Sequence, residues 1–140
     1  MSTYKIEKLE NEPILLFAAY GDYKISESHL EVEEVSKKII NNLDEPVYHI
    51  IDLSQISYDF NDILIGSKGV KDQDSTYFNP NIVETIFVMD INKTVRTVFQ
   101  GFASSAFGNF KPRLVGSLDE AFDYVRLQTS PSDNNRKLGS

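Results

Sequence analysis

The stretch VYHIIDLSQISYDFNDIL, from Val47 to Leu64, decides how the rest of the chain is interpreted. Its first part, Val47 to Leu53, is almost all β-branched, aromatic or aliphatic, which is typical of a strand buried on both faces of a parallel sheet. A short polar loop follows, and Asn61 or Asp62 can cap a new helix. The stretch therefore predicts a strand, a loop and a helix start. In an open α/β sheet such a junction lies at the carboxyl ends of the strands, where ligands and partners bind.

The composition is that of an ordinary globular domain. The chain has 140 residues, of which 41% are hydrophobic and 25% are charged, so it can bury a core and is not disordered as a whole. Cysteine is absent, which removes disulfides, thiolate metal sites and a cysteine nucleophile. No apolar run approaches the roughly 20 residues of a membrane span, and the N-terminal MSTYKIEKLE lacks the apolar core of a signal peptide. We expect a cytoplasmic protein without membrane insertion.

The charge argues against a nucleic-acid partner. The net charge is −7, whereas nucleic-acid binding depends on Lys and Arg side chains that neutralise phosphates. The local basic pairs, Lys37-Lys38 and Lys68/Lys71, are best explained as solvation of helix surfaces.

Two strands precede the first helix. Residues Tyr4 to Glu10 alternate in the manner of an edge strand, and the apolar run Ile14 to Tyr20 most simply pairs with them as an antiparallel hairpin. Because no helix separates these two strands, the sheet is predicted to be mixed. The strand Val47 to Leu53 is then reached through a crossover helix that covers one face of the sheet.

This crossover helix is predicted over Ser26 to Leu43. Ser28 and Glu31 have the spacing of a capping box, with Ser26 as the alternative cap. Charged side chains fill most other positions, and the expected apolar stripe consists of Val32, Val35, Ile39 and Leu43.

The second half of the chain continues the alternation of helices and strands. A helix from Asn61 to about Asp74 is weakened by Gly66 and Gly69, each of which lowers helix propensity by roughly 1 kcal/mol relative to Ala. The loop that follows, Asp72 to Pro80, contains Tyr77 and Phe78, which are expected to cover the edge of the core.

Two further strand and helix pairs complete the pattern. The strand Ile82 to Met89 precedes a helix capped from Asp90 to Asn92, and the brief strand Arg113 to Gly116 precedes a helix that opens with a capping box, Ser117 to Glu120. Residues 128–140 are predicted to be a flexible tail. The helix after Asn92 is expected to have a broad apolar face that comprises Val95, Val98, Phe99, Phe102, Ala103 and Ala106.

The element order is therefore β-β-α-β-α-β-α-β-α, a single α/β domain over residues 1–127 with a mixed sheet of about five strands and about four helices. This order, together with DLSQISYDFNDIL after a buried strand and SLDEAFDYV near the end, resembles the STAS family, the sulfate transporter and anti-sigma factor antagonist domains. The resemblance covers roughly Tyr4 to Leu127. It implies a STAS-like fold and a regulatory role in which the domain docks another protein.

The resemblance breaks down at the phosphorylation site of the family. In regulatory STAS members a loop of the form Asp-Leu-Ser, followed after several residues by Asp-Ser-Ser-Gly-Leu, carries a serine that a partner kinase phosphorylates. Asp52 to Ser54 match the start of this pattern and Leu64 matches its end, but Phe60 to Ile63 replace the centre, so the phosphoacceptor position is Asn61. Because an amide cannot take a phosphoryl group, we expect docking without a phosphoserine switch.

No catalytic or metal-binding signature stands out. His49 alternates with buried positions of its strand and is expected to be a core histidine satisfied by one hydrogen bond. Asp52, Asp59 and Asp62 gather at the junction as a magnesium site would, but the early acidic pair and the late lysine of a receiver domain are missing. Glycine loops for phosphates and a serine-hydrolase elbow are also absent. We therefore expect no enzyme activity, no metal and no cofactor.

Two functions from different classes remain open. The first is a non-enzymatic interaction module that docks a partner protein through the junction from Ser54 to Ile65. The partner is expected to have a basic patch, and this interpretation is also compatible with a homodimer of the chain. Its predicted partner-binding residues are Ser57, Tyr58, Asp59, Asn61 and Asp62. The second is a carrier of a small ligand or lipid, with an apolar cavity at the same end of the sheet lined by Tyr77, Phe78, Phe99, Phe102, Phe107 and Phe110.

Overall fold

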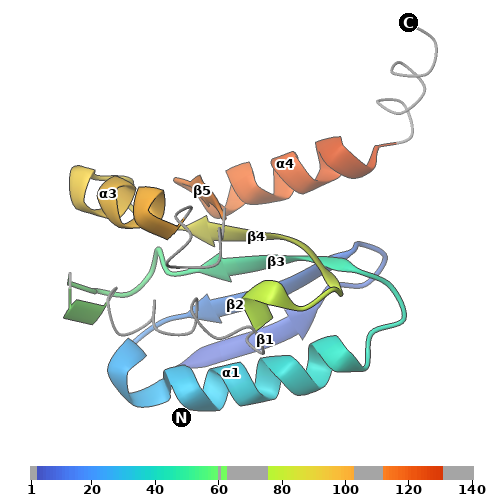
Figure 1. The fold of residues 1–140 in the computed structure, drawn as a ribbon, viewed down its shortest axis with the longest axis horizontal. Coiled ribbons are helices and arrows are strands. Elements are labelled where there is room, and N and C mark those ends of the chain that lie inside the picture. Colours follow the sequence, from blue (N-terminus) through green and yellow to red (C-terminus); the bar gives the residue numbers. More distant parts are fainter. Residues whose placement is uncertain (1–2, 60, 63–75, 103–111, 131–140) are drawn as a thin grey trace, which may run out of the picture.

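The structure, a computed structural model, describes residues 3–59, 61–62, 76–102 and 112–130. Its centre is one five-stranded sheet (Figure 1). The strands lie side by side in the order in which they occur along the chain: β1 (Tyr4–Lys8), β2 (Ile14–Ala19), β3 (Val47–Asp52), β4 (Ile82–Val88) and β5 (Arg113–Val115).

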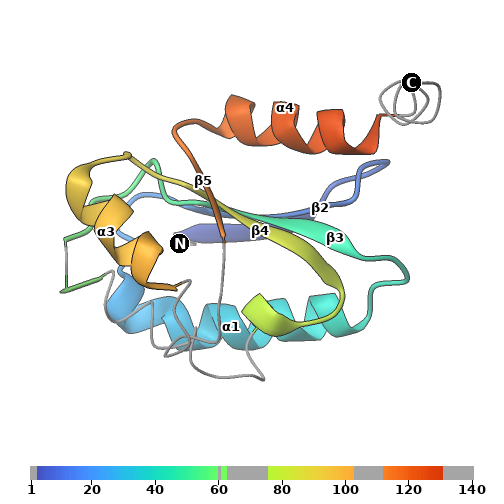
Figure 2. The same cartoon turned by 45° about the horizontal axis from the view of Figure 1, so that its top comes forward.

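Three α-helices pack around this sheet in the described part of the chain, with one short 3₁₀ helix, η2 (Thr76–Phe78). α1 (Ile25–Asn41) and α4 (Leu118–Thr129) lie on opposite faces of the sheet, and α3 (Lys93–Phe102) lies near the carboxyl ends of the strands (Figure 1, Figure 2). The predicted α/β fold with a mixed five-stranded sheet is confirmed.

The first two strands form the expected hairpin. β1 pairs antiparallel with β2, with Ile6 opposite Phe17. Asn11 in the connecting turn has a φ of 64°, a left-handed conformation that asparagine adopts more readily than most residues. All other strand pairs are parallel, which makes the sheet mixed.

β3 occupies the centre of the sheet and pairs with β2 on one side and β4 on the other. Of its residues, Tyr48 alone is not fully buried. Neighbouring residues point to opposite faces: Ile51 packs with Phe87 on the face covered by α1 and α3, whereas Ile50 packs against Ala121 and Val125 of α4. Helices on both faces explain why the strand is buried on both sides rather than alternating between buried and exposed residues.

α1 begins differently from the sequence-based expectation. The residue before it is Lys24, whose side chain makes no capping hydrogen bond; its backbone carbonyl accepts from the amide of Ser28 at 3.1 Å. Because Ile25 packs against the core, the helix starts before either candidate serine. Ser26 and Ser28 lie inside the first turn, so the predicted cap at Ser26 and the capping box of Ser28 with Glu31 are wrong.

The buried face of α1 is also rotated from the predicted one. Val35 was expected in the apolar stripe but is 37% exposed, whereas Ser36 and Ile40 are buried. The other members of the stripe pack partly against the core as expected. The apolar pattern does not identify Ser36, because serine is polar. Its burial shifts the centre of the buried face of α1 toward Ile40.

The caps of the two later helices agree with the sequence. Asn92 Oδ1 accepts a hydrogen bond from the amide of Val95 at 2.9 Å at the start of α3. Ser117 Oγ accepts one from the amide of Glu120 at 3.1 Å at the start of α4, which is one half of the predicted capping box. α4 continues through Thr129, past the expected domain end at residue 127.

Several expectations fall outside the described residues. The helix predicted from Asn61 to Asp74 is described only at Asn61 and Asp62, which are helical. The side chain of Phe102, residues 103–106 and residues 131–140 also lie outside the description. None of the helices in the described ranges has both the length and the apolar character that crossing a membrane requires.

Candidate functional site

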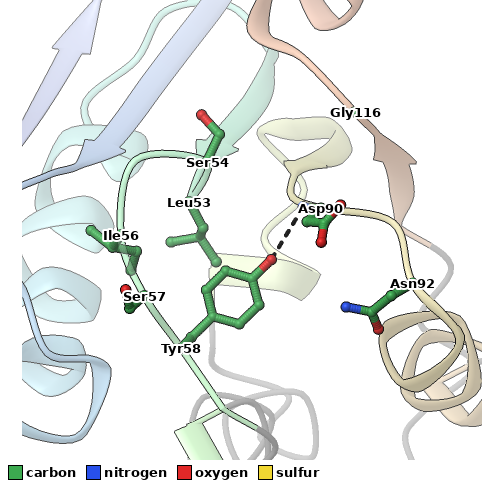
Figure 3. A pocket seen from close by; sticks show the side chains of 8 residues that line it. All are labelled: Leu53, Ser54, Ile56, Ser57, Tyr58, Asp90, Asn92 and Gly116. Atoms are coloured by element: carbon green, nitrogen blue, oxygen red, sulfur yellow. Dashed lines mark hydrogen bonds between the residues drawn. The ribbon is translucent and has the colours of Figure 1, made fainter.

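A cleft of about 440 Å³, open to solvent, lies at the carboxyl ends of β3, β4 and β5 (Figure 3). Three segments that are distant in the sequence build it: the chain after β3, the loop between β4 and α3, and the turn between β5 and α4. Its position follows from the topology, because the carboxyl ends of parallel strands meet at one edge of a sheet. The residues that line it are Leu53, Ser54, Ile56, Ser57, Tyr58, Asp90, Asn92 and Gly116.

The first wall of the cleft begins with a turn held by Asp52. Its side chain is buried, and Oδ1 accepts hydrogen bonds from Ser54 N at 3.0 Å and from Ser54 Oγ at 2.6 Å. A short polar side chain bonded to the backbone two residues later is a common way to end a strand and redirect the chain. Asp52 therefore sets the path of the exposed residues after β3.

Tyr58 connects two walls of the cleft. Its hydroxyl accepts a hydrogen bond from the backbone N of Asp90 at 3.2 Å, across 32 positions of the sequence (Figure 3). Burial raises the pKa of the Tyr58 phenol; the hydrogen bond from Asp90 opposes this rise, and the negative charge of Asp90 adds to it. The phenol is therefore neutral at physiological pH and fixes the distance between the two loops.

Asp59 and Asp62 form a reciprocal capping pair next to the cleft. Asp62 N donates to Asp59 Oδ1 at 2.9 Å, and Asp59 N donates to Asp62 Oδ2 at 3.0 Å. This is the geometry of a capping box, with Asp59 at the N-cap position. The expectation that Asn61 or Asp62 is the cap is wrong, because both residues are already helical. Asn61 is exposed.

The acidic residues of the junction do not converge on one point. Asp52 is bonded to its own turn, whereas Asp59 and Asp62 bond each other's backbone. Within the described ranges, no three His, Asp or Glu side chains are placed to hold a metal ion. The described structure therefore does not support a magnesium site at these three residues.

His49 lies away from the cleft, on the face of the sheet covered by α1. It is 3% exposed and pairs along the strands with Leu15 and Thr85. The expectation of one hydrogen bond is wrong, since neither ring nitrogen has a partner among the described residues; the buried hydroxyl of Thr85 has none either. Burial lowers the pKa of His49 to about 4, which keeps the imidazole neutral.

The aromatic residues proposed for an apolar cavity instead pack in the core where they are described. The ring centroid of Phe87 lies 6.2 Å from that of Tyr77 and 5.1 Å from that of Phe99. Phe78 packs against the same cluster, which agrees with the expected covering of the core edge. The side chain of Phe102 and residues 107 and 110 lie outside the described part.

Of the predicted partner-binding residues, the structure places Ser57 and Tyr58 in the cleft and Asp59, Asn61 and Asp62 beside it along the chain. Four lining residues fall outside the predicted junction from Ser54 to Ile65: Leu53, next to it in the sequence, and the distant Asp90, Asn92 and Gly116. Gly116 directly follows β5, and Asp90 and Asn92 lie in the loop between β4 and α3. The rule that strand ends meet could therefore have identified them once the strands were known to be neighbours.

Fold and site together define the class of the protein: an α/β domain with one mixed sheet, helices on both faces and a polar cleft at the carboxyl ends of its parallel strands. No protein-family model matches the chain, and comparisons with curated proteins and with solved structures found no significant match.

Proposed function

We propose that this domain is a non-enzymatic, STAS-like interaction module that docks a partner protein at the cleft and the adjoining capping pair, without a phosphoserine switch. The observation that carries the proposal is the position of Tyr58, a half-buried aromatic side chain in a cleft where three parallel strands end. Tyrosine is enriched among the residues that dominate binding energy at protein interfaces. The element order and the sequence resemblance support the STAS-like part of the proposal.

The chemistry of the lining supports docking over catalysis. The lining residues that the structure describes include neither histidine nor lysine, so the hydroxyl groups among them have no such general base beside them. The Ser54 hydroxyl donates to Asp52, but the same carboxylate oxygen also accepts from the Ser54 backbone, which is the arrangement of a turn. The carrier alternative has less support, because Tyr77 and Phe99 contribute to the core and the cleft lining is largely polar.

Two serine-to-arginine variants test the proposal. Ser57 and Ser26 are both exposed, but Ser57 lines the cleft and Ser26 lies on α1. The tagged wild type and the two tagged variants, Ser57→Arg and Ser26→Arg, would be used for parallel affinity purification from the source cells. Their melting temperatures would be measured first, to establish that the three proteins are equally stable. We expect a discrete set of proteins to be captured by the wild type and Ser26→Arg and lost with Ser57→Arg. Equal capture by all three would contradict docking at the cleft. A small molecule that native mass spectrometry finds bound to the wild type but not to Ser57→Arg would favour the carrier.

A further inference from the structure

The charge of the cleft indicates what kind of group it accepts. Among the described residues that line it, Asp90 is the charged one, and none is a lysine or arginine. The Asp90 side chain is exposed and has no hydrogen bond or ion pair with any described residue. Asp59 and Asp62, which follow Tyr58 in the sequence, add carboxylates beside the cleft. Lys93 is the basic residue nearest to Asp90 in the sequence; it begins α3 and is not among the lining residues.

The N-termini of the helices near the cleft favour an anion instead of a cation, but their electrostatic effect is weaker. Helices begin after Asp59, Asn92 and Ser117, and each N-terminus carries roughly half a positive charge. The side chains of these three residues accept hydrogen bonds from the first-turn amides, so those amides are not free to bind an anion. Asp59 and Asp62 offset the partial charge at the start of the helix after β3, and Asp119 and Glu120 in the first turn of α4 do the same for that helix. The exposed carboxylate of Asp90 therefore favours a cation at the cleft.

The protein already contains the arrangement that a cation in the cleft would create. Arg113 Cζ lies 3.8 Å from the centroid of the Tyr124 ring, and Arg113 Nε bonds Glu84 Oε2 at 3.1 Å. The Tyr124 hydroxyl donates to the same carboxylate at 2.6 Å. A tyrosine ring, a carboxylate and a guanidinium thus stabilise one another on the surface between β4, β5 and α4. The cleft presents the first two, Tyr58 and Asp90, side by side (Figure 3).

We propose that the cleft accepts an arginine side chain of the partner protein, with its guanidinium paired to Asp90 and stacked against Tyr58. This inference rests on the proposed function, since it names the chemistry of the group that docks. Arginine fits better than lysine because its planar guanidinium can stack on an aromatic ring while it bonds a carboxylate. A divalent metal fits poorly, because it needs several oxygen ligands and the described part of the cleft lining has one carboxylate.

Selection from a random 12-residue peptide library displayed on phage tests the inference with a defined probe. Peptides that bind the wild type but not Ser57→Arg are cleft-dependent, and we expect them to share an arginine. Replacing this arginine by citrulline, which is neutral and of similar shape, should weaken binding about tenfold, and Asp90→Asn should do the same. The two changes together should cost little more than either one, because they remove the same contact. Asp44→Asn, at an exposed turn between α1 and β3, should bind like the wild type.

The outcomes separate this inference from the proposed function. Cleft-dependent peptides that keep full affinity for Asp90→Asn, or that tolerate citrulline, would overturn the arginine assignment and leave docking in place. If the cleft-dependent peptides are acidic, the arginine assignment is overturned as well, docking stays in place, and the helix N-termini become the expected binding groups. If no selected peptide depends on Ser57, both the docking function and the arginine assignment fail.

Discussion

His49 is a polar side chain in the middle of an apolar sheet. The period of β3 predicts its burial, because it alternates with residues that point to the other face. The absence of a hydrogen bond among the described residues was not predictable, since it depends on which side chains the neighbouring strands bring alongside: Leu15 offers none, and Thr85 does not reach. Register across strands is a property of tertiary structure that the pattern of a single strand does not contain.

This burial makes stability depend on pH. The pKa of His49 is lowered to about 4 in the folded protein, against about 6.5 in the unfolded chain. Between these values the unfolded chain binds a proton that the folded protein does not, so the free energy of unfolding should fall as the pH drops from about 6.5 to about 4, by roughly 3 kcal/mol for this residue. Urea unfolding of the wild type and His49→Leu at pH 7 and pH 4.5 measures this. The variant should lose less stability on acidification; equal losses would show that His49 is not the titrating group.

The neighbouring hydroxyl gives a matched comparison. Thr85 Oγ1 is buried without a partner among the described residues, so Thr85→Val should raise the free energy of unfolding by roughly 1 kcal/mol. Thr76 is equally buried, but its hydroxyl lies 3.2 Å from Glu33 Oε2 in a hydrogen bond, so Thr76→Val should lower stability by a similar amount. Denaturant melts of the two variants should move in opposite directions, and a shift of the same sign would contradict the assignment of these hydrogen bonds.

Among the elements, the start of the helix after β3 has a double role. The carboxylate of Asp59 caps this helix, so reversing its charge changes folding as well as any contact with a partner. Asp59→Asn keeps the accepting oxygen and should leave the melting temperature nearly unchanged, whereas Asp59→Lys should cost roughly 1 to 2 kcal/mol. Thermal melts of both variants, followed by capture assays, separate the two roles. Equal melting temperatures would mean that the cap contributes nothing.

The orientation of α1 can be tested by a second matched pair. Ile40 is fully buried and Val35 is 37% exposed, although sequence periodicity favours Val35 as an inner residue. Ile40→Ala should lower the free energy of unfolding by roughly 2 to 5 kcal/mol, and Val35→Ala should cost much less because it leaves no cavity. Equilibrium denaturation measures both changes. A larger loss of stability for Val35→Ala than for Ile40→Ala would mean that the face of α1 predicted from the sequence is the buried one.

At the scale of the molecule, the candidate site depends on strand order. The sequence identifies Ser57 and Tyr58 because they follow an unmistakable buried strand. It does not reveal that Asp90 and Gly116 lie opposite them, since local patterns specify strands but not which strands are neighbours. Here the strands are ordered along the sheet as along the chain, and parallel pairing of β3, β4 and β5 brings their ends together. The cleft is therefore a consequence of topology.

The most direct test of docking at the cleft is a photo-crosslinking experiment in living cells. A photoreactive benzoylphenylalanine replaces Ser57 in one variant and Ser26 in another, and the covalent adducts are identified by mass spectrometry. Docking at the cleft predicts an adduct with a discrete partner protein from position 57 and none of that partner from position 26. An adduct from position 26 alone, or from neither position, would contradict it.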